Sequence, residues 1–247
     1  MSRVLIADDN VGMTLSCGNF LTKEKNIEIV GIVNNGIDAL KCYQEENPDV
    51  LLLDLDMPKM SGLEVIEELS KDETEIRKNN IIVISGTLDR LHPYNTAQVY
   101  RIMPKPLNYD KLLETIYEIQ ENLDDYRLEK EIKTMFLELN LTDTSLKGLD
   151  YLKKVVFYCY KYPEMRTHIT LAYEQVIRYY SLNKKKPKNI MWNLESMLKI
   201  YEKNVSKDFL QSYFYNYDFT RNLSPTYLVD LMVSHLDEKL EKKMVEV

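Results

Sequence analysis

The most constraining feature of this sequence is an apolar run at residues 51–53 that stops at a carboxylate, Asp54. Branched aliphatic residues without alternation are typical of a strand that is covered on both faces of a parallel sheet. Pro58 and Gly62 follow shortly, and they indicate that the chain leaves the strand and turns toward a helix. Open α/β sheets bind ligands at the carboxyl ends of their strands, so Asp54 is a candidate functional residue. The alternative is a strand followed by an acidic loop.

Three more apolar segments end at polar residues. Carboxylates within ~4 Å of one another repel by ~4 kcal/mol at an effective dielectric constant near 20, so a cluster of acids needs a cation. A hard divalent ion such as Mg2+ suits carboxylate, carbonyl and water ligands and leaves positions for phosphoryl oxygens. If the strands are parallel, one edge of the sheet gathers such groups: residues 3–7 run into Asp8 and Asp9, residues 81–84 into Ser85, and residues 100–103 into Pro104, Lys105 and Pro106.

The order and spacing of these residues resemble the receiver domain of two-component response regulators, over about the first half of the chain. Together with the strand and helix pattern, the resemblance implies a flavodoxin-like, doubly wound α/β fold with a five-stranded parallel sheet and five helices. It implies that Asp54 attacks the phosphorus of a phosphohistidine on a histidine kinase or phosphotransfer protein and forms an acyl phosphate. Ser85 and Lys105, the latter before a cis proline bond, would hold the phosphoryl oxygens.

The same resemblance implies a site for Mg2+ or Mn2+. Asp9 and Asp54 would bind the ion directly, Asp8 mostly through water, and Asp56 through its backbone carbonyl. Metal-assisted phosphoryl transfer relies on charge neutralisation and alignment, which such a set of groups supplies. Apart from Mg-dependent self-phosphorylation and autodephosphorylation at Asp54, no enzymatic activity is expected.

The segment departs from the receiver pattern at three positions. Ile102 stands where the family usually has a switch aromatic residue, with Tyr100 and Tyr109 nearby. Gly86 replaces the more common alanine, and Pro104 precedes the lysine. None of these changes removes a group used in phosphoryl transfer. We therefore expect the chemistry to be retained and the aromatic rearrangement that reports phosphorylation to be altered.

Charge is distributed unevenly along the chain. Residues 1–126 carry 12 Lys and Arg against 23 Asp and Glu, whereas residues 127–247 carry 20 against 16. This asymmetry favours an acidic module joined to a module that can bind polyanions. The alternative is that the excess lysines are ordinary solvated surface residues.

No apolar stretch approaches the ~20 residues of a membrane span, and the first residues lack a signal peptide's apolar core, so we expect a cytoplasmic protein without membrane contact. Three scattered cysteines indicate neither a zinc site nor disulfides.

The second half of the chain reads as all-helical. We expect a receiver domain over residues 1–121, a helical linker over 122–131 and an all-helical effector domain of about six helices over 132–247. In the first half, helices are expected at 13–24, 37–46, after Ser61, at 87–98 and after Asn108. In the second half they are expected at about 127–139, 146–161, 168–180, 188–203, 206–215 and 224–242.

The helical half resembles the carboxy-terminal domain of stage zero sporulation protein A, a family of transcription regulators of sporulation. The resemblance rests on residues 137–141, 146–152, 169–180 and 190–201, with weaker agreement at 209–217 and 226–236. It implies that residues 169–180 and 188–203 form a helix-turn-helix whose second helix enters the major groove of double-stranded DNA. Twelve of the 18 tyrosines also lie in this half, where at helical spacing they more often form core than nucleic-acid contacts.

The loop and second helix of this motif contain the candidate DNA-binding residues. The family's recognition helix carries arginines, but the aligned positions here hold Asn189, Trp192 and Glu195. A glutamate would repel phosphates, whereas Asn189 could read adenine and Trp192 could contact thymine methyl groups. Four lysines would sit beside the phosphate backbone: Lys184, Lys185, Lys186 and Lys188.

Two functions are compatible with these sequence features. The first is a phosphorylation-dependent response regulator that dimerises when phosphorylated and controls transcription by binding DNA. The alternative is a phosphoswitched protein-interaction module or phosphate sink, whose helical half has lost specific DNA binding and docks through a tyrosine-rich face. An independent enzyme in the second half has little support, because that half has only His168 and His235 as histidines and no glycine-rich phosphate loop.

Overall fold

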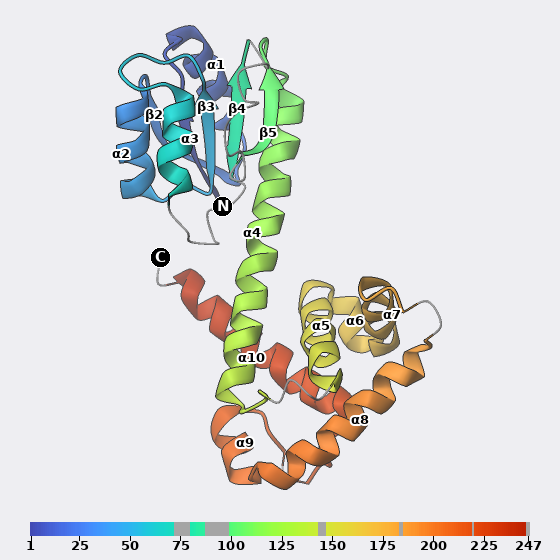
Figure 1. The fold of residues 1–247 in the computed structure, drawn as a ribbon. Helices are drawn as coiled ribbons and strands as arrows, with labels where there is room; N and C mark the ends of the chain where they lie inside the picture. The colour runs from blue at the N-terminus through green and yellow to red at the C-terminus, as the bar shows by residue number, and fades with distance from the viewer. Residues whose placement is uncertain (72–79, 87–98, 143–146, 183–184, 219, 246–247) are drawn as a thin grey trace. The chain divides into compact units, whose positions relative to one another are not determined.

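The computed structural model describes residues 1–71, 80–86, 99–142, 147–182, 185–218 and 220–245 (Figure 1). The chain divides into two compact units, Met1–Tyr126 and Arg127–Val247. The division falls inside the segment 122–131, for which the sequence predicts a linker. The helix expected at residues 87–98 and the candidate residue Lys184 lie outside the described residues.

The first unit is built on a parallel five-stranded sheet in the order β2-β1-β3-β4-β5, which confirms the predicted sheet. Its central strand β3 is buried at every residue, as its unbroken apolar sequence predicts. The strands are β1 (Ser2–Ala7), β2 (Ile27–Val33), β3 (Val50–Asp54), β4 (Ile81–Ser85) and β5 (Val99–Pro104).

Helices cover both faces of this sheet. Cys17 and Leu21 of α1 (Val11–Leu21) share one core with Leu112 of the first part of α4 (Tyr109–Glu138). On the other face, Tyr43 of α2 (Gly36–Glu46) and Ile66 of α3 (Gly62–Ser70) share a second core. Alternate residues of β1, β3 and β4 enter the two cores, so the sheet is covered on both sides (Figure 1). The described residues show four of the five expected helices.

Side-chain caps place the helix starts beside the carboxyl ends of the strands. The Asn10 side chain accepts a hydrogen bond from the Met13 N–H at 3.1 Å, so α1 begins directly after β1 and its two acids. Ser61 and Glu64 form a reciprocal capping box at the start of α3. Such caps satisfy the free N–H groups of a first helical turn and typically contribute about 1 kcal/mol. They keep the connections after β1 and β3 short.

Helix α4 contributes to the cores of both units. Ile119 and Leu123 belong to the core of the first unit, and Leu128 and Ile132 to the core of the second. The segment expected to be a helical linker is therefore part of one continuous helix. The helix ends at Glu138, and Asn140, two residues later, adopts a left-handed conformation with φ 55°, which is typical after a last helical turn.

The regular elements in the described residues of the second unit are helices, and α5 packs against α7, α8 and α10. Gly148 permits close packing, because a Cβ atom there would lie 2.7 Å from Met197 Cβ and 2.8 Å from the Asn193 carbonyl oxygen. The helices after α4 are α5 (Lys147–Lys161), α6 (Pro163–Thr167), α7 (Ile169–Tyr179), α8 (Pro187–Asn204), α9 (Lys207–Tyr213) and α10 (Pro225–Val245).

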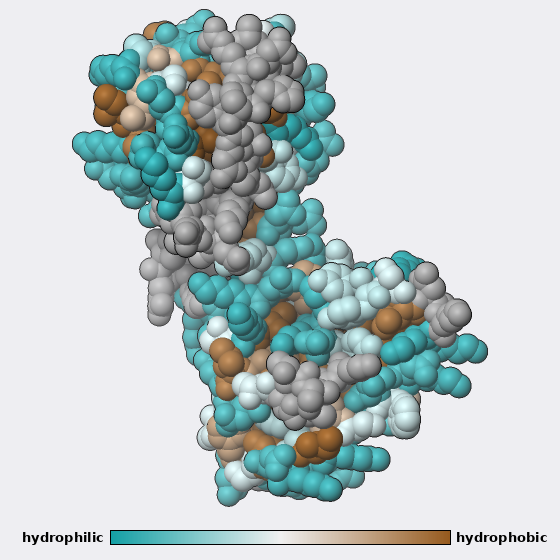
Figure 2. All heavy atoms as spheres, viewed as in Figure 1, coloured by the Kyte–Doolittle hydropathy of each residue, from teal (hydrophilic) through white to brown (hydrophobic). Residues whose placement is uncertain are grey.

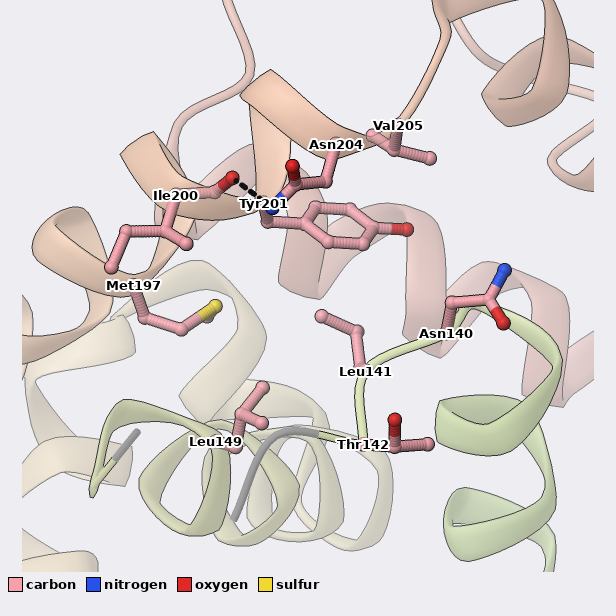
Figure 3. Close-up of a pocket in the computed structure, with 9 residues that line it drawn as sticks. All are labelled: Asn140, Leu141, Thr142, Leu149, Met197, Ile200, Tyr201, Asn204 and Val205. Atoms are coloured by element: carbon pink, nitrogen blue, oxygen red, sulfur yellow. Dashed lines mark hydrogen bonds between the residues drawn. The ribbon is translucent and has the colours of Figure 1, made fainter. Parts of the chain in front are cut away.

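A hollow of about 110 Å³ lies between the end of α4, the start of α5 and the second half of α8 (Figure 3). The Tyr201 hydroxyl donates to the Leu139 carbonyl at 3.0 Å, and the Asn204 amide donates to the Ile200 carbonyl at 3.1 Å. Both polar side chains therefore hydrogen-bond to backbone carbonyls of the same unit. The lining residues are Asn140, Leu141, Thr142, Leu149, Met197, Ile200, Tyr201, Asn204 and Val205.

Hydrophilic residues cover much of the visible face of each unit, with separate hydrophobic patches between them (Figure 2). None of the helices in the described ranges combines the length and the apolar character needed to cross a lipid bilayer.

Candidate functional site at the carboxyl edge of the sheet

Three carboxylates meet at the carboxyl ends of β1 and β3. Asp54 is the last residue of β3 and is 4% exposed, and Asp8 follows β1 and is 2% exposed. Asp9 is exposed to solvent. One carboxylate oxygen from each of the three lies within 4.8 Å of the others. The parallel register of β1 and β3 brings these residues together, as the sequence predicted.

The Lys105 ammonium group bridges two of these acids. Its Nζ atom lies 2.9 Å from Asp8 Oδ2 and 2.9 Å from Asp54 Oδ2. The Lys105 N–H donates to the Ser85 carbonyl at 3.1 Å, which holds the residue against the end of β4, and the Lys105-Pro106 bond is cis. Ser85 is buried at the end of β4, paired in register with Pro104. The same edge of the sheet therefore carries all five predicted groups.

Burial and the hydrogen bonds between charged groups act in opposite directions on the pKa of Asp54, and also on the pKa of Lys105. Burial, supported by the nearby Asp8 carboxylate, raises the pKa of Asp54, although hydrogen bonds from Lys105 and from the Asp56 N–H act to lower it. Burial alone would lower the pKa of Lys105, but its hydrogen bonds to Asp8 and Asp54 raise the pKa above the ordinary value. Lys105 therefore stays charged and compensates part of the negative charge.

These residues fit a hard divalent cation. Three carboxylates face one ammonium group, so the cluster retains excess negative charge, and every side-chain donor of the three acids is an oxygen. An additional cation would reduce the repulsion that raises the pKa of Asp54. The Asp56 N–H is directed to the Asp54 carboxylate, and a role for the Asp56 carbonyl stays a prediction.

Comparison with known families agrees with this geometry. Residues 4–117 match the family model of the response regulator receiver domain. This segment is a receiver domain.

Proteins of known sequence resemble the chain over part of its length. The protein-glutamate methylesterase/protein-glutamine glutaminase of Bacillus subtilis (strain 168) is 37% identical over 90 residues, which cover 36% of this chain and 24% of that protein. An uncharacterized transcriptional regulatory protein of the same organism, YhcZ, is 32% identical over 90 residues, 36% of this chain and 41% of that protein. The match therefore spans less than half of either relative.

Among solved structures, a DNA-binding response regulator of the LuxR family from Staphylococcus aureus is 27% identical to this chain. The alignment covers 48% of this chain and 98% of the other, with a TM-score of 0.42.

The aromatic residues near the switch position of the receiver domain are engaged with neighbouring helices. Ile102 on β5 is 38% exposed. The Tyr100 hydroxyl donates to Glu118 Oε2 at 3.1 Å, and the Arg101 guanidinium donates to the same oxygen at 2.8 Å. Tyr109 packs on Phe20 with 5.0 Å between ring centroids. No local sequence pattern indicates the Glu118 contacts, because their partners are far apart in the chain.

The second candidate site comprises α7, α8 and the described residues that flank them. Residue Ser181, at φ 52°, ends α7, and the Leu182 N–H donates to the Ile177 carbonyl at 2.9 Å. Lys185, Lys186 and Lys188 are exposed. Lys185 is also tied to α5, since its Nζ lies 3.2 Å from the Tyr151 hydroxyl. These lysines lie at the start of α8, and their contact with a phosphate backbone stays a prediction.

The aligned recognition positions on α8 have different surroundings. Trp192 is 67% exposed, and Glu195 is half-buried. The Asn189 side-chain oxygen accepts a hydrogen bond from the Lys186 N–H at 2.8 Å, so it closes the first turn of the helix. Reading adenine in the expected way requires both the oxygen and the nitrogen of the amide. In this structure, the Lys186 N–H already occupies one of the two lone pairs of the Asn189 oxygen.

Proposed function

We propose that the chain is a response regulator that accepts a phosphoryl group on Asp54 from a histidine kinase or phosphotransfer protein. The observation that carries the proposal is the position of Lys105, whose ammonium group lies 2.9 Å from both Asp8 and Asp54 beside the third acid, Asp9. Acids that can hold a cation, together with a lysine beside the accepting carboxylate, supply the charge neutralisation and positioning on which phosphoryl transfer depends.

In the proposed reaction, an Asp54 carboxylate oxygen forms a bond to phosphorus. The phosphorus–nitrogen bond of the phosphohistidine breaks, and the imidazole nitrogen keeps the electron pair. Lys105 exchanges its contact with Asp54 for a phosphoryl oxygen, and the Ser85 hydroxyl donates to another. Mg2+, held by Asp8, Asp9 and Asp54, would supply neutralisation of the charge on the phosphoryl oxygens. Autodephosphorylation would return the free carboxylate.

A small-molecule phosphodonor tests this reaction on the full chain. With acetyl phosphate and Mg2+, we expect the intact mass to increase by one phosphoryl group. After the donor is removed, the label should be lost with time in Mg2+ and more slowly when a chelator removes the ion. Asp54→Asn should remain unlabelled, whereas the matched variant of the neighbouring acid, Asp56→Asn, should still be labelled. An unchanged mass of the wild-type protein, or equal labelling of Asp54→Asn, rejects the proposal.

We further propose that the second unit binds double-stranded DNA through α7 and α8 and that phosphorylation promotes dimerisation and binding. Supporting this are the exposed lysines at the start of α8 and the excess of 20 Lys and Arg over 16 Asp and Glu in residues 127–247. Fluorescence anisotropy against genomic fragments, with phosphorylated wild type and Asp54→Asn, tests the proposal. Weak binding without sequence preference in the phosphorylated protein contradicts it.

The second candidate function is a phosphoswitched protein-interaction module. The observation that favours it is the exposure of apolar side chains on the helical unit, including Met191 at 41% and Tyr179 at 55%. Charge reversal distinguishes the two functions. If Lys186→Glu with Lys188→Glu leaves output in cells intact while Tyr179→Ala abolishes it, the protein-interaction function is supported over DNA binding.

A further inference from the structure

Helix α8 presents one continuous stripe to solvent. Side chains three or four residues apart lie on the same face of a helix. The opposite face carries the buried residues Ile190, Leu194 and Tyr201, which belong to the core of the unit. The stripe consists of five exposed residues, namely Lys188, Trp192, Ser196, Lys199 and Lys203.

The stripe combines an apolar centre with charged ends. The Trp192 side chain is 67% exposed, and leaving a large apolar side chain in water gives up most of its transfer free energy. Lysines lie on both sides of it over about 22 Å of helix length, at 1.5 Å per residue. The major groove of B-DNA offers the matching chemistry, because phosphates line both edges and thymine methyl groups are exposed on its floor.

The polar side chains near Trp192 are engaged with the helix itself. The Asn189 side-chain oxygen accepts from the Lys186 N–H, the Asn193 amide donates to the Asn189 carbonyl at 2.6 Å, and the Ser196 hydroxyl donates to the Trp192 carbonyl at 2.8 Å. Helix α8, which is described at every residue, contains no arginine. The arginine that most often pairs with guanine is therefore absent from this helix, and the amides of Asn189 and Asn193 each already make a hydrogen bond to the backbone.

We propose that Trp192 is a specificity-determining residue that reads the 5-methyl group of thymine in the major groove. The inference rests on the proposed DNA binding by α7 and α8. Lys188, Lys199 and Lys203 contact phosphates and position the helix, and the indole ring supplies the sequence preference by apolar contact. Glu195 is half-buried beside the stripe. Its carboxylate repels DNA phosphates, so this side of the helix faces the floor of the groove and not the phosphate backbone.

Deoxyuridine substitution isolates this contact, because uracil differs from thymine only by the missing methyl group. A preferred duplex is first selected from genomic DNA with the phosphorylated full chain. Each thymine is then replaced singly by deoxyuridine, and affinity is measured by anisotropy. Wild type should lose about fourfold in affinity at one or two positions, the factor expected for one buried methyl group.

Variants assign the methyl contact to one side chain. Trp192→Ala should bind the original duplex more weakly and respond to deoxyuridine at none of those positions, whereas Trp192→Phe should keep a response. Met191→Ala, which removes the neighbouring exposed apolar residue, should respond as wild type does. Because Trp192 is the chain's one tryptophan, a change of intrinsic fluorescence on binding gives an independent readout of contact.

The outcomes separate the two proposals. Specific binding with no deoxyuridine effect at any position overturns the role of Trp192 and leaves DNA binding intact. An undiminished deoxyuridine response in Trp192→Ala has the same meaning. Failure of the phosphorylated protein to bind any DNA overturns both proposals.

Discussion

Replacing Lys105 by methionine tests the electrostatic account of the receiver site. The substitution keeps most of the side-chain volume and removes the ammonium group that lies 2.9 Å from both Asp8 and Asp54. The two acids are almost fully buried and would then face each other and Asp9 without that cation. We expect the first unit to be less stable at neutral pH and to depend more strongly on a divalent ion.

The size of the effect follows from the contacts. At an effective dielectric constant near 20, one unit charge pair at 2.9 Å interacts by roughly 6 kcal/mol. Since the Lys105 side chain is 31% exposed and regains hydration on unfolding, the net loss is smaller. Removing one partner of a buried ion pair typically costs 3–5 kcal/mol, so we expect a loss of about 3 kcal/mol without metal.

The loss should depend on pH with a defined sign. Burial already raises the pKa of Asp54, and removing Lys105 raises it further because a cause that lowers the pKa is gone. A carboxyl group with a raised folded-state pKa binds more protons in the folded state than in the unfolded state, so stability rises as pH falls. The deficit of Lys105→Met should therefore be largest near neutral pH and shrink as the pH falls through the raised pKa of Asp54.

Hydrogen exchange of peptides from β1 and β3 in the full chain measures this directly. A loss of about 3 kcal/mol corresponds to exchange that is faster by roughly a factor of 100. Mg2+ should restore more protection in Lys105→Met than in wild type, since it replaces the missing cation. Lys71→Met, which removes an exposed lysine paired with Glu68, is the control and should leave exchange unchanged. A deficit that is constant with pH and insensitive to Mg2+ would refute the reasoning.

Three further predictions concern the second unit and the fit of single side chains. Gly148→Ala should destabilise the chain by about 1–3 kcal/mol in urea unfolding, because its Cβ would lie 2.7 Å from Met197 Cβ. Gly86→Ala should not, because among the described residues, its chain neighbours aside, no atom lies within 4 Å of the added group. Tyr201→Phe leaves a buried carbonyl unpaired and should lower the melting temperature, at a cost of about 1–2 kcal/mol. Burial, with a neighbouring lysine, lowers the pKa of His235, so stability should fall as pH drops through about 6.5, and His235→Phe should flatten that dependence in pH-dependent melting.

The sheet and the gathering of its site residues follow from sequence because both depend on local patterns. Unbroken apolar runs predict buried parallel strands, and parallel strands necessarily bring their carboxyl ends to one edge. The positions of Asp8, Asp54 and Lys105 at strand ends therefore suffice to predict that they lie close together. The sharing of one ammonium group between the two buried acids could not be predicted in this way, because it depends on how the chain after β5 is placed against β4.

On helix α8, which aligns with a recognition helix, side-chain positions were harder to predict from sequence. An alignment treats Asn189 as an outward-facing reader, but the structure turns its oxygen back to the Lys186 N–H. The sequence contains a signal for this contact. Asn189 lies three positions after Lys186, the N-cap of α8, and a side chain at that position can accept a hydrogen bond from the N-cap N–H. The exposure of Trp192 could be expected from the alignment alone, because a tryptophan at helical spacing is as compatible with a core as with a surface.

The shared helix α4 has a practical consequence for work on separated halves of the protein. A fragment that stops at residue 121 lacks Leu123, and one that starts at 132 lacks Leu128, so each would be missing a leucine from its interior. A cut between residues 124 and 127 spares both, but it still exposes two new helix ends that fray. Weak activity of an isolated half can therefore reflect a damaged helix end and is no measure of communication between phosphorylation and output.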